Sequence, residues 1–252
     1  MNQSSPHYQP SLAVTTSFVE QPKQAPQEHL VKALRGSAHD INNVFTSIVA
    51  MSELALMEQG VTKEVRSALT SIKSYVERGN LITEQISKYA HSFKCNPKNI
   101  AITPFLIKFK ANINCKLPIN HTLKIIPPHN IDALYGDEDQ LSNALEALVL
   151  NSSEALLSRN NNSESITIMV ENKNDNQIKL SVEDNAGGLE EEVENKASIP
   201  FFSRKLGTNH PGLGLSIAQQ IAISHQGHLE IDNRAPNGCK VNLIIPIINK
   251  SI

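Results

Sequence analysis

A histidine early in the chain stands among residue types that could support nucleophilic chemistry. His39 is followed by Asp40, and Asn43 lies four positions further on, one turn away if the segment is helical. Near neutral pH an imidazole is largely uncharged and can attack an electrophile, while a neighbouring carboxylate can take the proton from its other ring nitrogen. An ordinary solvated histidine is the alternative, and this short run alone leaves it open.

An acidic residue followed by two glycines forms a second candidate site. Asp184 lies two positions after the alternating run 178–182, and Ala186, Gly187 and Gly188 come after it. Glycine lets the backbone approach a ligand closely, and a carboxylate at that point can accept a hydrogen bond from the amino group of adenine. A glycine pair after a strand is more often only a turn, so this motif also has a purely structural alternative.

A glycine-rich stretch, 207–215, precedes an apolar segment that is typical of a helix. Gly212, Leu213, Gly214 and Leu215 stand where that helix would begin. Free backbone N–H groups and the helix dipole favour phosphate at such a position. The stretch lacks the Gly-Lys-Ser/Thr ending of a Walker loop, so it predicts a phosphate site of another kind.

One asparagine interrupts an apolar run in the middle of the chain. Asn151 follows Leu148, Val149 and Leu150 in a segment that we expect to be helical. Its amide oxygen would suit a Mg²⁺ ion that bridges phosphate groups. A side chain that bonds only to the helix backbone is the alternative.

Two long helices are predicted to position His39. From Glu28, apolar residues recur at spacings of three and four until Gly60 interrupts the pattern, and a second helical segment starts after Thr62, a suitable N-cap. We expect an antiparallel hairpin, and because a lone hairpin leaves apolar surface exposed, we expect two copies to form a dimeric four-helix bundle. The seam of the first helix consists of Leu30, Leu34, Ala38, Ile41, Phe45, Ile48, Ser52 and Ala55.

An α+β sandwich is predicted for the remainder, because short β-branched runs alternate with helical stretches. The predicted strands are 100–103, 123–126, 166–170, 178–182, 229–231 and 241–245, and the predicted helices are 104–115, 137–158 and 214–224. We therefore expect a flexible tail over 1–27, rich in Pro, Gln and Ser, a hairpin domain over 28–96 and a sandwich domain over 97–252.

Composition narrows the functional classes. A formal net charge of -2 over 252 residues gives no reason to expect nucleic acid as a partner. Cys95, Cys115 and Cys239 are far apart and odd in number, which favours reduced thiols over a disulfide framework. No apolar run approaches the roughly 20 residues that a membrane span needs. We therefore expect a soluble, cytoplasmic protein without a membrane span.

Taken in order, these motifs resemble those of two-component sensor histidine kinases. The order is His-Asp-x-Asn-Asn, an asparagine helix, Asp-Asn-Ala-Gly-Gly-Leu, Phe-Phe-Ser-Arg-Lys and Gly-Leu-Gly-Leu-Ser, and it covers 28–246. The resemblance implies a dimerisation and histidine phosphotransfer hairpin, followed by a Bergerat-type ATP-binding domain, in a chain without its own sensor domain.

The resemblance also implies roles for individual residues. His39 would be the phosphoacceptor, Asp40 its general base and Asn43 a residue that positions water in the reverse, phosphatase reaction. Asn151 would bind Mg²⁺. The other residues implied at the ATP site are Asp184, Ala186 and Gly188 at the adenine, Phe202 and Lys205 at the lid, and Gly212, Leu213, Gly214 and Leu215 at the phosphates; Gly238 would form the last turn.

The implied activity is an ATP-dependent protein histidine kinase, a phosphotransferase of a two-component phosphorelay. It would phosphorylate itself at His39, pass the phosphoryl group to an aspartate of a response regulator receiver domain, and act in signal transduction with a separate sensor protein. The receiver would dock on the hairpin, where Met51, Leu54 and Met57 are candidate contacts or, equally, part of a wider bundle core.

Two alternatives belong to other classes. Ala147 replaces the second asparagine that this family usually has one turn before Asn151, which would suit a non-enzymatic histidine phosphotransfer or scaffold protein with a degenerate ATP site. An ATPase of the chaperone or mismatch-repair kind would need a water-activating glutamate, and Glu146 stands one place out of register for that role.

Overall fold

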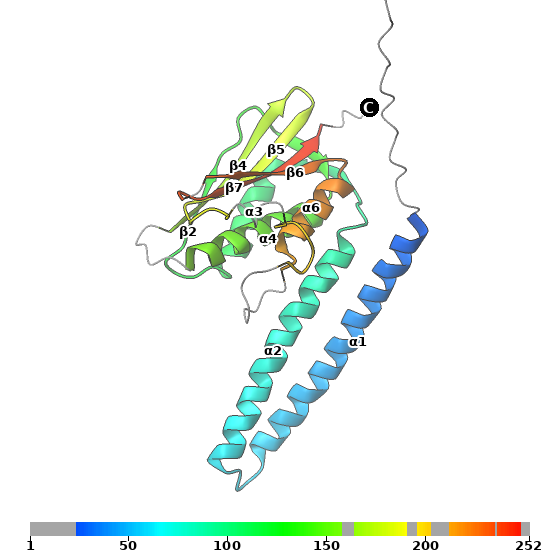
Figure 1. Ribbon diagram of the computed structural model, residues 1–252, viewed down its shortest axis with the longest axis vertical. Helices are drawn as coiled ribbons and strands as arrows, with labels where there is room; N and C mark the ends of the chain where they lie inside the picture. Colours follow the sequence, from blue (N-terminus) through cyan, green and yellow to red (C-terminus); the bar gives the residue numbers. More distant parts are fainter. Residues whose placement is uncertain (1–23, 158–163, 191–195, 203–211, 235, 248–252) are drawn as a thin grey trace, which may run out of the picture.

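The computed structural model describes residues 24–157, 164–190, 196–202, 212–234 and 236–247, and Figure 1 shows a long helical hairpin joined to a layered unit of helices and strands. The predicted tail lies outside the described residues up to position 23, and the first helix begins within it at Gln24. In the described parts of the chain, no helix combines the length and hydrophobicity needed to cross a membrane.

The hairpin consists of α1 (Gln24–Met57) and α2 (Lys63–His91), which run antiparallel. Between them Gly60 has a φ of 87°, a left-handed conformation that glycine adopts without steric cost. The Thr62 hydroxyl caps α2 by accepting a hydrogen bond from the Val65 amide at 3.4 Å. The predicted break and the predicted cap are both confirmed.

Polar contacts fix the register of the two helices. Near the open end, Arg35 Nη2 donates to the Ala90 carbonyl at 3.1 Å. Nearer the turn, Lys73 and Glu53 form an ion pair of 2.7 Å. The helices therefore cannot slide along each other without breaking a contact at either end.

A close approach of the helices holds the turn of α1 that follows His39. A Cβ atom on Gly79 would lie 2.5 Å from the ring of Phe45, so that ring packs directly on the backbone of α2. One turn along α2, buried Thr83 donates a hydrogen bond to Asn42 Oδ1. Asn42 thus faces the inside of the hairpin.

The second unit contains a five-stranded sheet in the order β2-β4-β5-β7-β6 and a two-stranded ribbon of β1 and β3. Neighbouring strands are antiparallel, except that β2 and β4 are parallel. Helices α3, α4 and α6 lie on one face of the large sheet (Figure 1), which confirms the predicted sandwich. The bounds are β1 (Lys98–Ala101), α3 (Ile102–Asn114), β2 (Thr122–Ile126), β3 (Ala133–Gly136), α4 (Glu138–Leu157), β4 (Ser165–Asn174), β5 (Gln177–Asp184), α6 (Gly214–Ser224), β6 (His228–Asn233) and β7 (Cys239–Pro246).

Alternation along β5 explains the layering. Ile178, Leu180 and Val182 are buried in the core that the sheet shares with the helices, whereas Lys179 and Glu183 face the other side. Successive strand residues point to opposite faces, so the apolar set is buried only when the helices cover that one face. The last residue of β5, Asp184, belongs to the covered set.

Two features differ from the predicted elements. The predicted strand 100–103 ends at Ala101, and α3 begins at Ile102 because Pro104 falls in the first helical turn, where proline is well tolerated. Strand β3 was not predicted. Its sequence, Ala-Leu-Tyr-Gly, has no β-branched side chain, and the strand is specified by its pairing with β1 rather than by its own pattern.

The hairpin and the sandwich meet at the end of α2. Lys88 of α2 forms an ion pair with Glu146 of α4 at 2.8 Å, and Lys116 reaches the same carboxylate at 2.9 Å. Gln140 Nε2 donates to the backbone carbonyls of His91 and Lys94 at 3.2 and 2.5 Å. Side-chain and backbone contacts therefore both attach α4 to the hairpin.

Candidate functional site

His39 lies on the solvent side of α1. Its side chain is 75% exposed, and its Nδ1 lies 3.4 Å from Asp40 Oδ1 and 3.3 Å from the side-chain nitrogen of Asn43. Because both contacts involve Nδ1, the other ring nitrogen, Nε2, is available to a reacting group. The structure thus brings together the three residues to which the resemblance assigns the chemistry.

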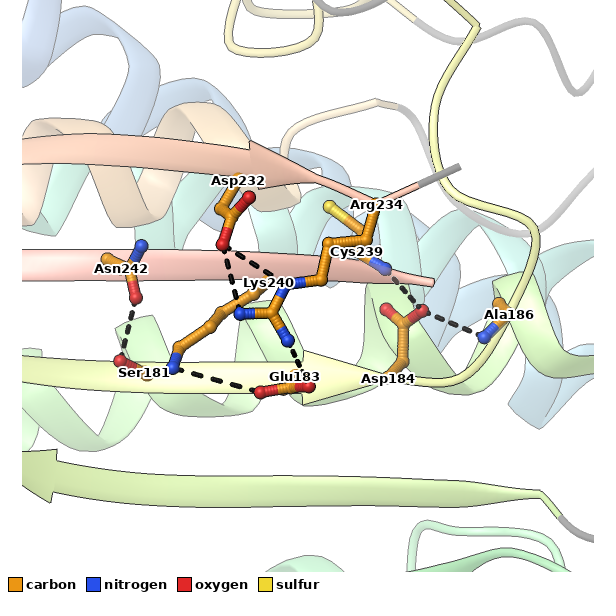
Figure 2. Close-up of polar contacts among 9 residues, drawn as sticks. All are labelled: Ser181, Glu183, Asp184, Ala186, Asp232, Arg234, Cys239, Lys240 and Asn242. Atoms are coloured by element: carbon orange, nitrogen blue, oxygen red, sulfur yellow. Dashed lines mark hydrogen bonds and ion pairs between the residues drawn. The ribbon is translucent and has the colours of Figure 1, made fainter. Parts of the chain in front are cut away.

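Asp184 ends β5, and its carboxylate is buried between β7 and α4. Oδ1 accepts hydrogen bonds from the backbone N–H groups of Ala186 at 3.1 Å and Cys239 at 3.2 Å (Figure 2). Oδ2 accepts a hydrogen bond from the Ser152 hydroxyl at 2.7 Å. Three donors therefore hold this carboxylate, which is only 8% exposed, in one orientation.

The neighbouring carboxylate, Glu183, lies on the opposite face of the sheet. It forms an ion pair of 2.6 Å with Arg234, which also pairs with Asp232 at 3.0 Å (Figure 2). Lys240 lies 3.8 Å from Glu183. These surface ion pairs join β5, β6 and β7, so of the two adjacent acids only Asp184 faces the helices.

The backbone around Asp184 is closely fitted. Gly238 has a φ of 130°, and a Cβ atom there would lie 1.9 Å from the Asp184 carbonyl oxygen. Gly188 also has a positive φ, 75°. Beyond it, Leu189 exchanges two hydrogen bonds with the Asn233 side chain, of 2.8 and 2.7 Å. The turn after β5 is therefore fixed to the end of β6, and the end of β5 packs against the turn that precedes β7.

The beginning of α6 lies against Asn151 of α4. A Cβ atom on Gly214 would lie 2.5 Å from Asn151 Oδ1 and 2.7 Å from Nδ2. The N-cap residue, Leu213, is fully buried and provides no side-chain cap, and Leu215 packs against the core. Asn151 thus places a polar amide beside a helix end whose N–H groups carry partial positive charge.

Phe202 and Gly212, the residues on either side of 203–211, are in close contact. Gly212 has a φ of 73°, and a Cβ atom there would lie 2.5 Å from the carbonyl oxygen of Phe202. Phe202 is half-buried next to this glycine. Lys205, the lysine that the resemblance assigns to phosphate, lies outside the described residues.

Two consecutive residues of α4 join these parts into one site, which fits a nucleotide. Asn151 touches the start of α6, and Ser152 bonds to Asp184. The carboxylate can accept from an amino group, and the uncapped helix start with Gly214 can receive phosphate. The described residues contain no cluster of three or more His, Cys, Asp or Glu that could hold a metal ion; the Asn151 amide oxygen is a suitable single ligand for Mg²⁺ held mainly by phosphates.

Sequence reasoning missed Ser152 and Cys239 as partners of the acidic residue. The only signal for Ser152 was its place beside Asn151, and a backbone donor such as Cys239 N–H leaves no signal in residue type. Both contacts depend on the packing of β7 and of one turn of α4 against the end of β5.

Glu146 does not face this site. Burial opposes its ionisation, but hydrogen bonds from Lys88 and Lys116 outweigh that effect and lower the pKa of the carboxyl. A carboxylate held by two lysines at the hairpin junction is not placed to activate water at a nucleotide beside Asn151. The geometry disfavours the chaperone-like ATPase alternative.

Residues 136–249 match the family described as Histidine kinase-, DNA gyrase B-, and HSP90-like ATPase. The matched segment begins at the last residue of β3. It contains every described residue of the nucleotide site, from Asn151 to Gly238.

The chain is also similar to curated histidine kinases. It is 25% identical over 224 residues to the signal transduction histidine-protein kinase AtoS of Escherichia coli, covering 78% of this chain and 35% of AtoS. It is 24% identical over 221 residues to sporulation kinase C of Bacillus subtilis, covering 86% of this chain and 49% of that kinase. The chain thus spans between a third and a half of the length of these relatives.

Solved structures share the fold. Full-length ShkA in complex with AMPPNP has a TM-score of 0.66 at 15% identity, covering 88% of this chain and 47% of ShkA. The histidine kinase ThkA in complex with the response regulator protein TrrA has a TM-score of 0.61 at 19% identity, covering 95% of this chain and 70% of that chain. Residues 136–249 thus carry the match to the histidine kinase-, DNA gyrase B- and HSP90-like ATPases, and the chain as a whole is similar to histidine kinases.

Proposed function

We propose that this chain is an ATP-dependent autokinase that phosphorylates its own His39 and passes the phosphoryl group to an aspartate of a response regulator. One observation carries the proposal: an exposed imidazole, with Asp40 beside its Nδ1 and Asn43 one turn further on, shares the chain with a candidate nucleotide site around Asn151 and Asp184. In this proposal, residues 28–96 dimerise and carry the phosphoryl group, and residues 97–252 bind ATP.

Nε2 of His39 is the nucleophile in the proposed reaction. A bond forms between Nε2 and the γ-phosphorus of ATP as the bond from that phosphorus to the β,γ-bridging oxygen breaks, and ADP leaves. Asp40 accepts the proton from Nδ1, so that the phosphorylated ring becomes neutral. Its position 3.4 Å from Nδ1 supports this role.

The remaining residues position the nucleotide in this proposal. Asp184 accepts a hydrogen bond from the adenine amino group, and Asn151 provides the amide oxygen for Mg²⁺, which neutralises phosphate charge when bound. Ala186 and Gly188 shape the turn beside the base. The residues proposed at the phosphates and the lid are Phe202, Lys205, Gly212, Leu213, Gly214 and Leu215.

We propose that the hairpin pairs with a second copy into a four-helix bundle. A groove of about 440 Å³ on the hairpin is lined by Val44, Ser47, Ile48, Met51, Ser52, Leu69 and Ile72. Ile41, Val65, Tyr75 and Leu81 are further exposed apolar side chains of α1 and α2. Apolar surface of this extent is typical of a protein interface.

A receiver domain is the proposed acceptor, and it would dock on the hairpin. Leu54 and Met57 are 61% and 79% exposed, and they lie beyond His39 towards the turn, outside the residues that line the groove. The related ThkA was solved with a response regulator protein. In a separate phosphatase reaction, Asn43 is proposed to position the water that hydrolyses the aspartyl phosphate of the regulator and releases inorganic phosphate.

The alternative is a phosphotransfer or scaffold protein that no longer loads itself. Ala147 supports it, because it supplies no second amide one turn before Asn151 and packs against the core instead. The two readings differ in one measurement. A calorimetric titration of the chain with Mg·ADP should give binding if it is a kinase, and no heat if the ATP site is degenerate.

Radiolabelled ATP tests the proposed reaction. Label should enter the wild-type chain and be lost on addition of a receiver domain. His39→Ala should abolish labelling while Mg·ADP binding is unchanged, because His39 lies on the hairpin and not in the nucleotide site. Labelling that persists in His39→Ala would contradict the assignment of His39 as the phosphoacceptor.

A further inference from the structure

We propose that Ser152 is a positioning residue for nucleotide recognition: its hydroxyl aims the one acceptor site of Asp184 that remains for the base. This inference rests on the proposed function, in which Asp184 reads adenine. It adds a residue of α4 that touches no nucleotide atom itself but sets the direction of the group that does.

Counting acceptor sites leads to this assignment. An ionised carboxylate offers about two acceptor sites on each oxygen. Both sites on Asp184 Oδ1 are used, by the backbone N–H groups of Ala186 and Cys239 at 3.1 and 3.2 Å. On Oδ2, the Ser152 hydroxyl uses one site at 2.7 Å. A ligand can therefore bond to this carboxylate only at the second site of Oδ2.

The neighbours of Ser152 prevent its hydroxyl from moving away. Ser152 is 6% exposed. On one side, Asn151 lies against Gly214 of α6; on the other, Ser153 is 2.8 Å from Nδ1 of buried His121. This turn of α4 is thus held by packing and hydrogen bonds before and after Ser152, and its hydroxyl stays directed at Asp184.

A single acceptor with a fixed direction selects among purine bases. It suits an N–H donor, such as the exocyclic amino group of adenine. A purine with a carbonyl oxygen at that position would place oxygen against the carboxylate, which a buried acceptor cannot satisfy. Removing the Ser152 hydroxyl leaves two free sites on Oδ2, so the carboxylate no longer has one preferred direction for the amino group.

The test compares two nucleotides on the full chain by calorimetric titration in Mg²⁺. One is ATP, and the other is purine riboside triphosphate, which lacks the amino group. We expect Ser152→Ala to weaken ATP binding on the order of tenfold, the effect of losing the hydrogen bond from the adenine amino group to the charged Asp184. The binding of purine riboside triphosphate, which lacks that amino group, should change little. Ser152→Thr, which keeps the hydroxyl, should restore the preference for ATP.

Two further variants make the result decisive. Ser152→Cys keeps the size of the side chain with a weaker donor, so it should reproduce the loss of preference even if Ser152→Ala is poorly folded. Ser153→Ala removes a neighbouring buried hydroxyl that does not reach Asp184, and it should keep the wild-type preference for ATP. An equal loss for both nucleotides in Ser152→Ala and Ser152→Cys would overturn the inference, since Ser152 would then act only on folding.

Failure of the proposed function would look different. If the wild-type chain bound neither nucleotide, ATP binding itself would be rejected, and the inference with it. If the wild-type chain bound ATP, and Ser152→Ala kept the full preference over purine riboside triphosphate, only the role of Ser152 would be rejected.

Discussion

Asn151 and Gly214 are in direct contact: a Cβ atom on Gly214 would lie 2.5 Å from the Asn151 amide oxygen. The contact links the middle of α4 to the first residue of α6, two helices that are 63 positions apart at this point and otherwise meet through apolar side chains. A larger side chain at Gly214, the residue proposed to cradle phosphate, would therefore displace Asn151, the residue proposed to hold Mg²⁺.

Gly214→Ala should therefore impair nucleotide binding. The added methyl group would push the Asn151 amide out of its position, and forced overpacking of this kind typically costs about 1–3 kcal/mol. We expect the affinity for Mg·ADP to fall by about tenfold to a hundredfold in a calorimetric titration. Gly36→Ala is the matched control, because a Cβ atom at Gly36 meets nothing within 4 Å. Unchanged affinity in Gly214→Ala would contradict the placement of Asn151 at the site.

Gly238 should be the most sensitive glycine for folding of the sandwich. Its φ of 130° and the 1.9 Å approach of a Cβ atom to the Asp184 carbonyl oxygen leave no room for a side chain. Gly238→Ala should lower the free energy of unfolding by about 2–3 kcal/mol or more, measured by urea denaturation. Gly36→Ala serves again as the control and should be neutral or slightly stabilising, as is usual for alanine in a helix. A Gly238→Ala chain as stable as wild type would contradict this turn geometry.

Periodicity predicted the elements well because it depends on local pattern. The spacing of apolar residues located both hairpin helices, residue type located the cap at Thr62, and the helix expected around 214–224 agrees with α6. It could not locate β3, whose strand conformation comes from pairing with β1, nor the end of β1, where Pro104 favours a helix start. These are cases in which tertiary pairing or a single residue outweighs the local pattern.

The candidate site was only partly visible in the sequence. Motif order indicated Asp184 and Asn151, but it could not indicate that consecutive residues of α4 reach two different partners, or that Asp184 is bonded to Cys239 N–H. Likewise, Glu146 was considered for water activation because of its place in the helix. Only the packing of α2 against α4 reveals that this carboxylate binds Lys88.

The Lys88–Glu146 pair should stabilise the junction between hairpin and sandwich. The side chains are 23% and 17% exposed. Burial would lower the pKa of Lys88, but its hydrogen bonds to Glu146 and Glu84 outweigh this and raise it. A double-mutant cycle with Lys88→Met and Glu146→Gln should give a coupling free energy of about 1 kcal/mol in thermal or urea unfolding. Because the pKa of Glu146 is lowered on folding, this contribution is present above the ordinary value of 4.5 and is lost as pH falls through the folded value.

A second pair gives the matched comparison for that cycle. Lys108 and Glu138 also form an ion pair, of 2.9 Å, but the Lys108 side chain is 67% exposed. Solvent and salt screen such a pair, so its coupling should be clearly smaller and should disappear at high ionic strength. Equal coupling for both pairs would show that the junction contributes nothing beyond an ordinary surface contact.

His225 connects the sandwich to the segment that follows α2, and its geometry requires the neutral ring. Nδ1 lies 2.8 Å from the Ile221 carbonyl and donates to it, while Nε2 accepts the Asp137 backbone N–H at 2.9 Å. The Cys95 sulfur lies 3.5 Å from the same nitrogen. Burial lowers the pKa of His225, although the Ile221 carbonyl and the charge of Asp137 act in the opposite direction.

Stability should consequently fall in mild acid. Below the ordinary histidine pKa of 6.5 the unfolded chain binds a proton at position 225 and the native chain does not, so the free energy of unfolding decreases until pH reaches the lowered native value. Urea unfolding at pH 8, 7, 6 and 5.5 should reveal this slope. In His225→Asn the protein should start less stable, but the decrease between pH 6.5 and 5.5 should be smaller. His129→Gln changes a histidine at an exposed position and should keep the wild-type dependence of stability on pH. If His225→Asn also kept that dependence, the native His225 ring would accept a proton freely, and the hydrogen bond from the Asp137 N–H would not restrain it.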